Sequence, residues 1–327
     1  MLKEIFKFFY GGMLDKKRIR NKKEYNNFYI TPEEINEAYS KVDRTKKKLV
    51  LGVTSGRSGM KWVYEIFRHH DNADGGGERN VEAEAFWRYI KFNKLAIDTQ
   101  GIIEVTKREI LLDWIENDIS ITVSPYFAHD FLTLVDELKV DNIIWGITNP
   151  KFTVTSFYNK GWYEEKITCS NQKQTVGFQI NDSWSHFLGR VIPSGDKFEK
   201  WDALTRVGKV SWFVNMIHSE IYLQILKLPK EKVYLFKLED ADQNYDLYLA
   251  MAKYFNLQPI MSKSKFLSLK KLAANDKENK VEEWTNLETK EFEFELKFIS
   301  EVYRNKLDQY APYVEKNLDS YNKRKSQ

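Results

Sequence analysis

The sequence predicts an α/β protein whose central parallel sheet has helices on both faces. Four short runs rich in apolar and β-branched residues are expected to be strands, at residues 49–53, 119–123, 142–147 and 232–237. The first run has the unbroken apolar character of a strand that is buried on both sides. The runs are separated by segments with helical patterns, as right-handed crossovers between parallel strands require. We therefore expect a three-layer architecture.

The composition is that of a folded chain without internal disulfide bonds. Of the 327 residues, 42% are hydrophobic and 30% are charged, which excludes a disordered chain and a collagen-like repeat. Cys169 is the only cysteine, which fits a reducing, cytoplasmic compartment. No uncharged apolar run approaches the ~20 residues that a membrane-spanning helix needs.

Residues 1–48 are expected to be an extension before an α/β domain at residues 49–327. An amphipathic helical stripe covers residues 2–14, and six Lys and Arg side chains crowd into positions 16–23. The extension has a net charge of +6, so the rest of the chain carries −2 of the total of +4. Because residues 49–327 are slightly acidic, they do not indicate a nucleic-acid partner. Residues 1–23 either dock on the domain with a solvated basic linker or contact an anionic membrane surface.

Helices are expected at several places along the chain. Thr31 and Pro32 have the pattern of an N-cap followed by the first helical residue. Further helices are expected at residues 61–70 and 127–138, after Pro150, over most of 201–226, and at 242–256 and 288–310. Ligands of parallel α/β sheets bind beyond the carboxyl ends of the strands. Functional residues are therefore expected in the segments that follow Val53, Val123, Ile147 and Lys237.

The segment between the first expected strand and the first helix has the residues of an anion-binding loop. It reads Thr-Ser-Gly-Arg-Ser-Gly-Met-Lys-Trp over residues 54–62. Two glycines let the backbone turn its N–H groups toward an anion, and the following helix N-terminus adds a partial positive charge. Arg57 and Lys61 supply full positive charges. The alternative is a merely structural turn.

This loop differs from a Walker A loop, so a P-loop kinase is the less favoured function. A Walker A loop has four residues between its glycines and a Ser or Thr after the Lys. Here two residues separate Gly56 from Gly59, and Trp62 follows Lys61. A transfer from a phosphate-bearing donor without a required metal fits better, and Cys169 and the scattered histidines form no metal-ligand pattern.

Three segments together resemble the sulfotransferase family that uses 3′-phosphoadenosine 5′-phosphosulfate. Residues 54–62 resemble its 5′-phosphosulfate loop, and residues 148–158 resemble its 3′-phosphate segment after the third strand of the sequence pattern. Leu238-Glu239-Asp240, before a helix, resembles its Tyr/Leu-Glu-Asp-Leu turn. The order and spacing of the three agree over about residues 49–290. The resemblance implies a P-loop-like sulfotransferase fold and this donor.

The resemblance also implies roles for individual residues. Arg57 would contact the transferring sulfuryl group and the 5′-phosphate, and Ser156 the 3′-phosphate. Trp62 would stack on adenine, its alternative being a core aromatic residue. Lys280, in a basic loop, would close over the nucleotide, its alternative being a solvated lysine. The other implied donor contacts are Ser55, Gly56, Ser58, Gly59, Met60, Lys61, Asn149 and Lys151.

Two positions depart from the family pattern. Thr148 stands where the family usually has Arg, so a main cation for the 3′-phosphate is missing. Lys151, Lys160 or Lys280 are candidates to replace it. Met60 replaces a hydroxyl residue that is common at its position. These departures keep open a non-catalytic nucleotide-binding protein of the same fold.

A transfer to an alcohol needs a base near the acceptor hydroxyl group. The candidates are Glu78 and Glu82, which follow three glycines expected to form a loop, and His129. For the two glutamates the alternative is compensation of a helix dipole, and for His129 it is a structural histidine. Aromatic residues are dense in the expected acceptor segments. They suit sugar rings or apolar acceptors, and their alternative is ordinary core packing. Residues 124–127, Ser-Pro-Tyr-Phe, resemble the carbohydrate-modifying branch of the family. The resemblance therefore implies a carbohydrate or a lipid-linked glycan as the acceptor.

Overall fold

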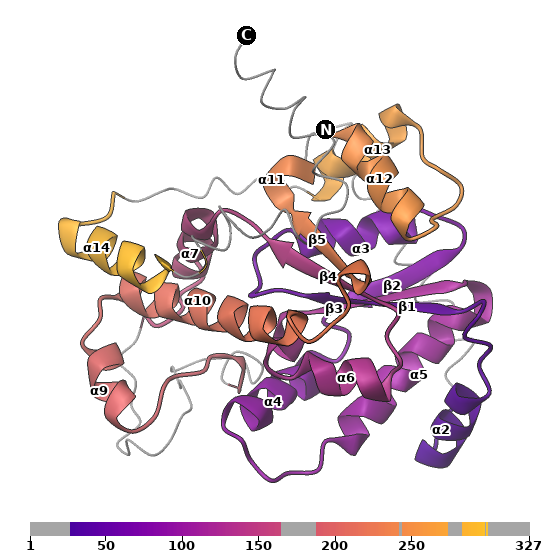
Figure 1. Cartoon of the computed structure of the whole chain (residues 1–327), viewed down its shortest axis with the longest axis horizontal. Coiled ribbons are helices and arrows are strands. Elements are labelled where there is room, and N and C mark those ends of the chain that lie inside the picture. Colours follow the sequence, from indigo (N-terminus) through magenta and orange to yellow (C-terminus); the bar gives the residue numbers. More distant parts are fainter. Residues whose placement is uncertain (1–26, 165–187, 242–243, 274–282, 298, 300–327) are drawn as a thin grey trace.

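The computed structural model describes residues 27–164, 188–241, 244–273, 283–297 and 299 (Figure 1). Several predictions fall outside these residues: the stripe at 2–14, the basic run at 16–23, Cys169, Lys280 and the helical tail beyond residue 299. They stay predictions.

Five parallel strands form a single sheet in the order β2-β3-β1-β4-β5 (Figure 1). Their bounds are β1 Lys48–Val53, β2 Ala73–Gly77, β3 Ile119–Ser124, β4 Asn142–Ile147 and β5 Val233–Lys237. The four predicted strands are confirmed, and β1 lies at the centre between β3 and β4. The predicted class, an α/β protein with a parallel sheet flanked by helices, is confirmed as well.

The strand β2 has no signal in the sequence, where its three glycines suggest a loop. It pairs along its whole length with β3, from Ala73 opposite Ile119 to Gly77 opposite Val123. A Cβ atom at Gly75 would lie 2.0 Å from the backbone oxygen of Ile121, so this position needs glycine. The expectation of a glycine loop is therefore wrong, because backbone pairing makes these residues an ordered strand.

The helices have the following bounds. They are α2 Pro32–Ser40, α3 Met60–Arg68, α4 Val81–Phe92, α5 Gln100–Glu116, α6 Phe131–Glu137, α7 Pro150–Tyr158, α9 Asp196–Asp202, α10 Arg206–Ile225, α11 Leu238–Ala241, α12 Tyr245–Tyr254, α13 Lys263–Ala273 and α14 Asn286–Glu295. Two 3₁₀-helices, η1 Pro125–His129 and η2 Lys230–Lys232, connect elements.

Two predicted helices are interrupted in the structure. The expected helix 127–138 divides into η1 and α6 at Asp130, whose φ of −160° and ψ of 52° lie outside the helical region. The Ser124 side chain caps η1 by accepting from the backbone N–H of Tyr126 at 3.1 Å. The expected helix 201–226 divides at Thr205, whose side chain caps α10. The predicted cap at Thr31 is confirmed, and it forms a complete capping box with Glu34.

Helices lie on both faces of the sheet (Figure 1), and a hydrophobic layer lies between the sheet and the helices on each side. Side chains alternate along β1: Leu49 and Leu51 join the layer with α5, α6 and α10, whereas Val50 joins the layer with α3, α12 and α13. This alternation follows from the pleat of a strand, where successive side chains point to opposite faces. The two hydrophobic layers thus hold β1, β4 and β5 from both sides.

The strand β3 turns a row of hydroxyl groups toward α4 and α5. Ser120, Thr122 and Ser124 are all buried, and the Ser120 hydroxyl donates to Asp113 Oδ2 at 2.6 Å. Asp113 in turn pairs with the buried side chain of Arg79 at 2.6 Å. A polar layer therefore lies between β3 and the helices on this face, where β1, β4 and β5 present apolar residues.

The packed core begins before residue 49. Ile35 and Tyr39 of α2 belong to the larger hydrophobic cluster, and the Tyr39 hydroxyl donates to the backbone oxygen of Leu138 at 2.7 Å. Residues 32–40 are thus part of the same packed unit, although the sequence places them in the extension 1–48.

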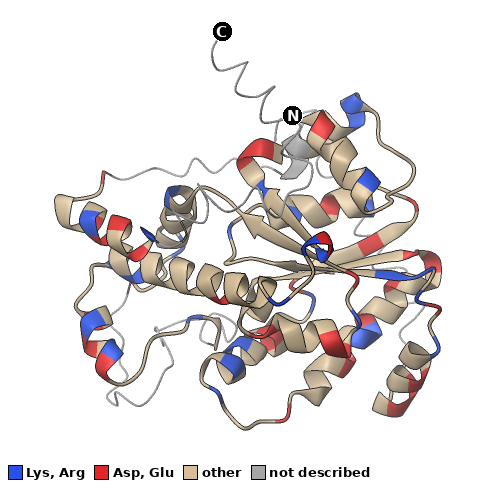
Figure 2. Cartoon of the chain, in the orientation of Figure 1, with Lys and Arg blue, Asp and Glu red and all other residues tan. Residues whose placement is uncertain are grey.

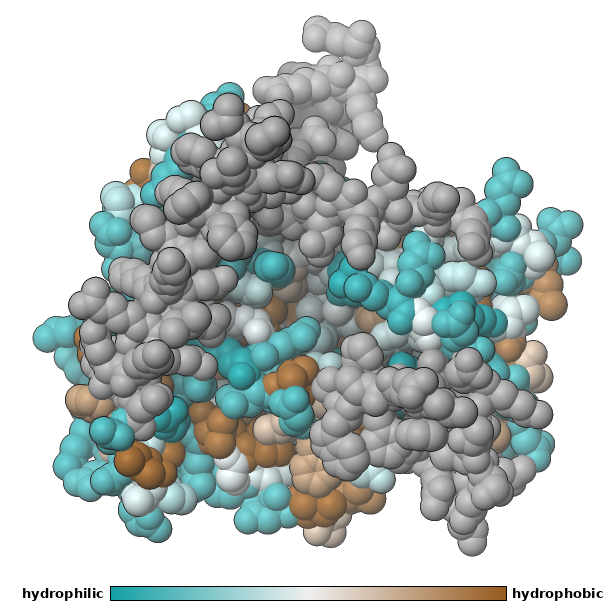
Figure 3. Space-filling view, turned by 180° about the vertical axis from the view of Figure 1, so that it is seen from behind, coloured by the Kyte–Doolittle hydropathy of each residue, from teal (hydrophilic) through white to brown (hydrophobic). Residues whose placement is uncertain are grey.

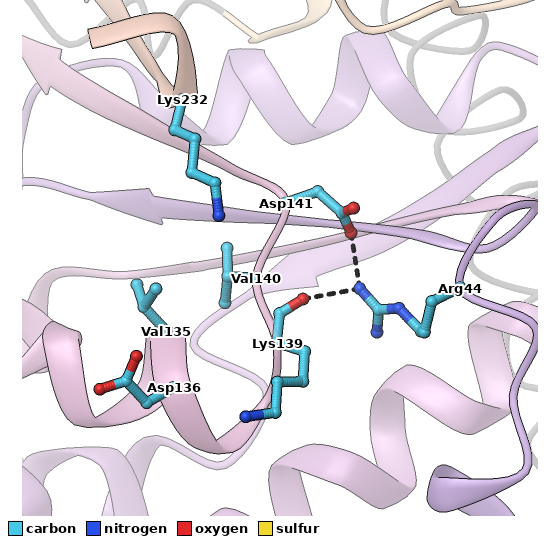
Figure 4. A pocket seen from close by; sticks show the side chains of 7 residues that line it. All are labelled: Arg44, Val135, Asp136, Lys139, Val140, Asp141 and Lys232. Carbon is cyan, nitrogen blue, oxygen red and sulfur yellow. Dashed lines mark hydrogen bonds and ion pairs between the residues drawn. The ribbon is translucent and has the colours of Figure 1, made fainter. Parts of the chain in front are cut away.

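The amino ends of β1 and β4 are tied together by charges (Figure 4). Asp141 accepts from Arg44 Nη2 at 2.5 Å and from the backbone N–H of Leu49 at 2.9 Å. Arg44 also donates to the backbone oxygen of Lys139 at 2.7 Å. The pocket in Figure 4 lies at this edge, opposite the edge where α/β proteins bind ligands.

Charged residues lie mainly on the helices and connections, and the strands are largely free of them (Figure 2). On the reverse face, apolar side chains gather near the lower edge among hydrophilic ones (Figure 3). Large exposed apolar side chains include Phe28, Ile30, Leu95, Ile97 and Phe152. Within the described residues, no helix combines the length and the apolar character needed to cross a membrane.

Candidate functional site

The segments with the predicted site residues meet at the carboxyl edge of the sheet. The loop 54–59 follows β1, Glu78 follows β2, and Ser124 ends β3. Thr148 and Asn149 follow β4, and α11 follows β5. Because all five strands are parallel, these five exits lie on one edge. The fold thus brings together residues that are up to about 190 positions apart in the chain.

The loop after β1 has an unusual backbone. Three of its residues have positive φ angles, 95° at Gly56, 58° at Arg57 and 73° at Gly59. Among the described residues, no hydrogen bond uses the backbone N–H groups of Arg57, Ser58 and Gly59. The hydroxyl groups of Thr54 and Ser58 are hydrogen-bonded to each other. Unused N–H groups next to the N-terminus of α3 are the donors that a phosphate or sulfate group takes up.

Arg57 joins this loop to α7. Its Nε donates to the Ser156 hydroxyl at 2.7 Å, and its side chain is otherwise exposed. Burial of part of the guanidinium lowers the pKa of Arg57, and the nearby Glu78 opposes this effect. An arginine nonetheless keeps its charge in a protein. Lys61, on the first turn of α3, is also exposed, so two cations face solvent at this loop.

Two other predicted donor contacts lie in the core. Met60 packs over the sheet: a Cβ atom at Gly146 would lie 2.3 Å from its sulfur, and one at Gly52 would lie 2.7 Å from its terminal carbon. Trp62 is 6% exposed and its ring contacts Phe236 and Phe266, with centroid distances of 5.7 and 5.6 Å. The placement of Trp62 therefore favours the core alternative over stacking on adenine. Ser55 is buried as well.

The segment after β4 is tied to the Leu-Glu-Asp turn. The Thr148 hydroxyl and the backbone N–H of Asn149 both donate to the Glu239 carboxylate. The Asn149 side chain caps α7 by accepting from the backbone N–H of Lys151 at 3.0 Å. The residue that replaces the family arginine is therefore engaged with a carboxylate, and two of the three resembling segments are in direct contact.

Lys151 lies at the exposed start of α7. Its Nζ is 5.1 Å from the centre of the Trp284 ring, which also contacts Phe292 of α14 at 4.9 Å. Lys160 is exposed past the end of the same helix. Of the three lysines considered as replacements for the missing arginine, Lys280 is the one outside the described residues.

The three candidate bases differ in their surroundings. Glu78 follows β2 with a φ of 49°, and its side chain is exposed at the edge of the site. Partial burial raises the pKa of Glu78, while Arg88 and Arg57 lower it. Glu82 is exposed one helical turn further on.

His129 has little basic character. Burial lowers its pKa to about 3, and the charge of Arg88 acts in the same direction. Its ring contacts Phe92 at 5.2 Å, and its Nε2 is shielded without a hydrogen-bond partner among the described residues. A group with so low a pKa is a poor proton acceptor at neutral pH. The burial of His129 therefore makes the two exposed glutamates, Glu78 and Glu82, the better candidate bases.

The sequence did not indicate two charged residues near Glu78 as part of the site. Arg88 of α4 is 1% exposed and donates to the backbone oxygens of Gly189, at 3.0 Å, and Pro125. Burial lowers the pKa of Arg88 to about 10. Glu84 of the same helix is also buried. Their spacing of four residues gave a weak signal, since it places two opposite charges on one helix face.

The described part of the chain contains no group of three or more His, Cys, Asp and Glu side chains arranged to hold a metal ion. The prediction that no metal is required stays a prediction. In comparisons with known proteins, no family model matches the chain, and no curated protein matches it either.

Proposed function

We propose that this chain is a sulfotransferase that moves a sulfuryl group from 3′-phosphoadenosine 5′-phosphosulfate to a hydroxyl group of a carbohydrate or lipid-linked glycan. The observation that carries the proposal is the hydrogen bond from Arg57 to Ser156. It joins the loop assigned to the 5′-phosphosulfate with the segment assigned to the 3′-phosphate. Two motifs from distant parts of the sequence thus meet at one edge of the sheet, as a ligand with phosphates at two ends requires.

The residues present fit the phosphate end of this donor. The loop after β1 combines several groups that attract an anion. They are unused backbone N–H groups, the N-terminus of α3, and the cations Arg57 and Lys61. The donor would supply the sulfuryl group, with 3′-phosphoadenosine 5′-phosphate as the leaving group. The cations of the loop would stabilise the negative charge that develops on the 5′-phosphate oxygen.

Glu78 is the proposed general base. Its carboxylate would take the proton of the acceptor hydroxyl group while the hydroxyl oxygen forms its bond to sulfur. The bond between sulfur and the 5′-phosphate oxygen breaks in the same step, so charge moves from Glu78 toward the cations of the loop. Arg57 is near enough to Glu78 to influence its pKa. The proposed base and a cation of the loop would therefore lie on two sides of the reacting groups.

The acceptor class rests on the resemblance and on aromatic side chains of α4, the helix that follows Glu78 in the chain. Phe86 and Tyr89 of α4 are half-buried, and their rings lie nearly parallel with a centroid distance of 6.3 Å. Such rings provide platforms for the apolar faces of sugars.

A calorimetric titration with 3′-phosphoadenosine 5′-phosphate, compared with ATP plus Mg²⁺, tests the proposed donor. We expect tighter binding of the bisphosphate. Tighter binding of ATP with Mg²⁺ would refute the proposal and favour a P-loop kinase, the less favoured alternative.

The variant Arg57→Ala tests the site itself. We expect sulfuryl transfer to fall by about 100-fold or more, because a group that stabilises charge in the transition state is lost. Lys46→Ala is the control, since it also removes one positive charge but from an exposed residue at the opposite edge. Full activity of Arg57→Ala would remove this residue from the mechanism.

One observation favours a second function, a non-catalytic nucleotide-binding protein of the same fold. Thr148 holds no charge and its hydroxyl group is engaged by Glu239, so the 3′-phosphate loses the arginine expected at this position. Binding of the bisphosphate without transfer to any glycan tested would support this alternative.

A further inference from the structure

The carboxyl group of Glu84 is enclosed behind the turn that presents Glu78. Glu84 is 3% exposed, and its Oε1 accepts from the backbone N–H of Asn80 at 3.2 Å. Its Oε2 is shielded from solvent and has no hydrogen-bond partner among the described residues. An enclosed oxygen without a donor is costly for a carboxylate, whereas a protonated carboxyl group tolerates it better.

The groups around Glu84 come from the turn and from the end of β3. Burial raises the pKa of Glu84 to about 7, and the hydroxyl group of Ser124 and the Asn80 N–H lower it. The charge of Glu78 raises this pKa further, whereas Arg79 lowers it. On the α5 side, Asp113 and Glu109 pair with Arg79. Of the nearby carboxylates, Glu78 is thus the one that raises the pKa of Glu84.

We propose that Glu84 is a positioning residue for Glu78: its buried carboxyl group holds the turn 78–80 and, while it is protonated, leaves Glu78 as the charged carboxylate of the two. The backbone bond to Asn80 is the mechanical part of this role. The electrostatic part follows from like charge, because the charge of Glu78 disfavours ionisation of the enclosed Glu84 carboxyl group.

The use of this pair depends on the function proposed above. While Glu84 keeps its proton, Glu78 is the charged member and can accept the proton of an acceptor hydroxyl group. Above neutral pH Glu84 ionises as well, and the enclosed charge disturbs the turn. The buried residue thereby sets the upper pH limit of the site.

The test is a carbon-13 NMR titration of the glutamate carboxyl carbons in the full-length protein without ligand. The variants are Glu84→Gln, which assigns the signal, and Glu78→Gln, which removes the neighbouring charge. Glu33→Gln is the control, because Glu33 is an exposed glutamate in the first turn of another helix. We expect one carboxyl signal that titrates near pH 7 in the wild type and in the control. It should disappear in Glu84→Gln and move to lower pH in Glu78→Gln.

A titration that stays in place in Glu78→Gln overturns the inference, and this variant changes an exposed side chain, so it does not depend on the fold of Glu84→Gln. Desulfation of the donor is measured over the same pH range. We expect the wild-type rate to fall by about tenfold per pH unit well above neutral pH, and Glu84→Gln to lack this fall. A purely structural Glu84 would give both proteins the same profile, which would also overturn the inference. A Glu84 titration that responds to Glu78→Gln, without any desulfation, would refute the proposed function and leave the electrostatic link between the two glutamates supported.

Discussion

The buried pair of Arg79 and Asp113 gives a prediction about stability that does not depend on the function. The Arg79 side chain is 2% exposed, and its Nη2 donates to Asp113 Oδ2 at 2.6 Å and to the backbone oxygen of Ile121 at 2.8 Å. The change Asp113→Asn keeps the shape but removes the charge that compensates the guanidinium. Removal of one partner from a buried pair costs about 3–5 kcal/mol. The amide oxygen of the substituted side chain still accepts a hydrogen bond, and Glu109 Oε2 remains 3.9 Å from Arg79 Nη1. We therefore expect the free energy of unfolding to fall by the lower end of this range, about 3 kcal/mol.

The assay is urea unfolding at pH 7, followed by tryptophan fluorescence, with stability taken from the midpoint and slope of the transition. Asp118→Asn is the matched control, because Asp118 pairs with Lys47 at 3.1 Å but is 61% exposed. An exposed pair contributes about 0–1 kcal/mol. Equal effects of the two substitutions would refute the reasoning, since burial is the difference between the pairs.

Two further predictions concern acid stability and the donor. Burial lowers the pKa of His218 to about 3, from an ordinary value of 6.5. Between these two pH values the unfolded chain binds a proton at this histidine, whereas the folded chain does not. The contribution of the neutral His218 to the free energy of unfolding is therefore fully present above pH 6.5 and is lost as the pH falls toward 3. His218→Gln, which keeps an acceptor for Trp145 Nε1, should spare about 3 kcal/mol of this loss near pH 4; an equal loss in both proteins, measured by urea unfolding, would contradict it. Lys151→Gln should weaken calorimetric binding of 3′-phosphoadenosine 5′-phosphate by about tenfold and leave adenosine 5′-phosphate unaffected. Equal weakening of both nucleotides would place Lys151 away from the 3′-phosphate.

The sheet was largely predictable because buried strands need apolar side chains. The runs that begin at Leu49 and Asn142 are recognisable for this reason, and the segments that follow them were correctly expected at one edge. The strand β2 could not be found in this way, because glycines carry no side-chain signal and the strand depends on pairing with a segment more than 40 residues later.

The site was less predictable than the sheet because side-chain direction depends on distant contacts. The sequence places Trp62 one residue after Lys61, but the partners that bury its ring are Phe236 and Phe266, far along the chain. Glu84 similarly lies in an acidic run typical of an exposed helix start. Its burial follows from the docking of α4 against η1 and β3, which no local pattern encodes.

The hydrogen bond between Arg57 and Ser156 also sets the distance between two segments of the site. It fixes the gap between the loop after β1 and the helix α7 before any ligand arrives. A nucleotide that reaches both segments must match this gap, and a longer 5′ chain would have to separate them. The orientation of the guanidinium group is likewise settled during folding, so a ligand of the right span binds without the entropic penalty of ordering that side chain. Under the proposed function, selection among nucleotides would be a matter of span as well as of charge.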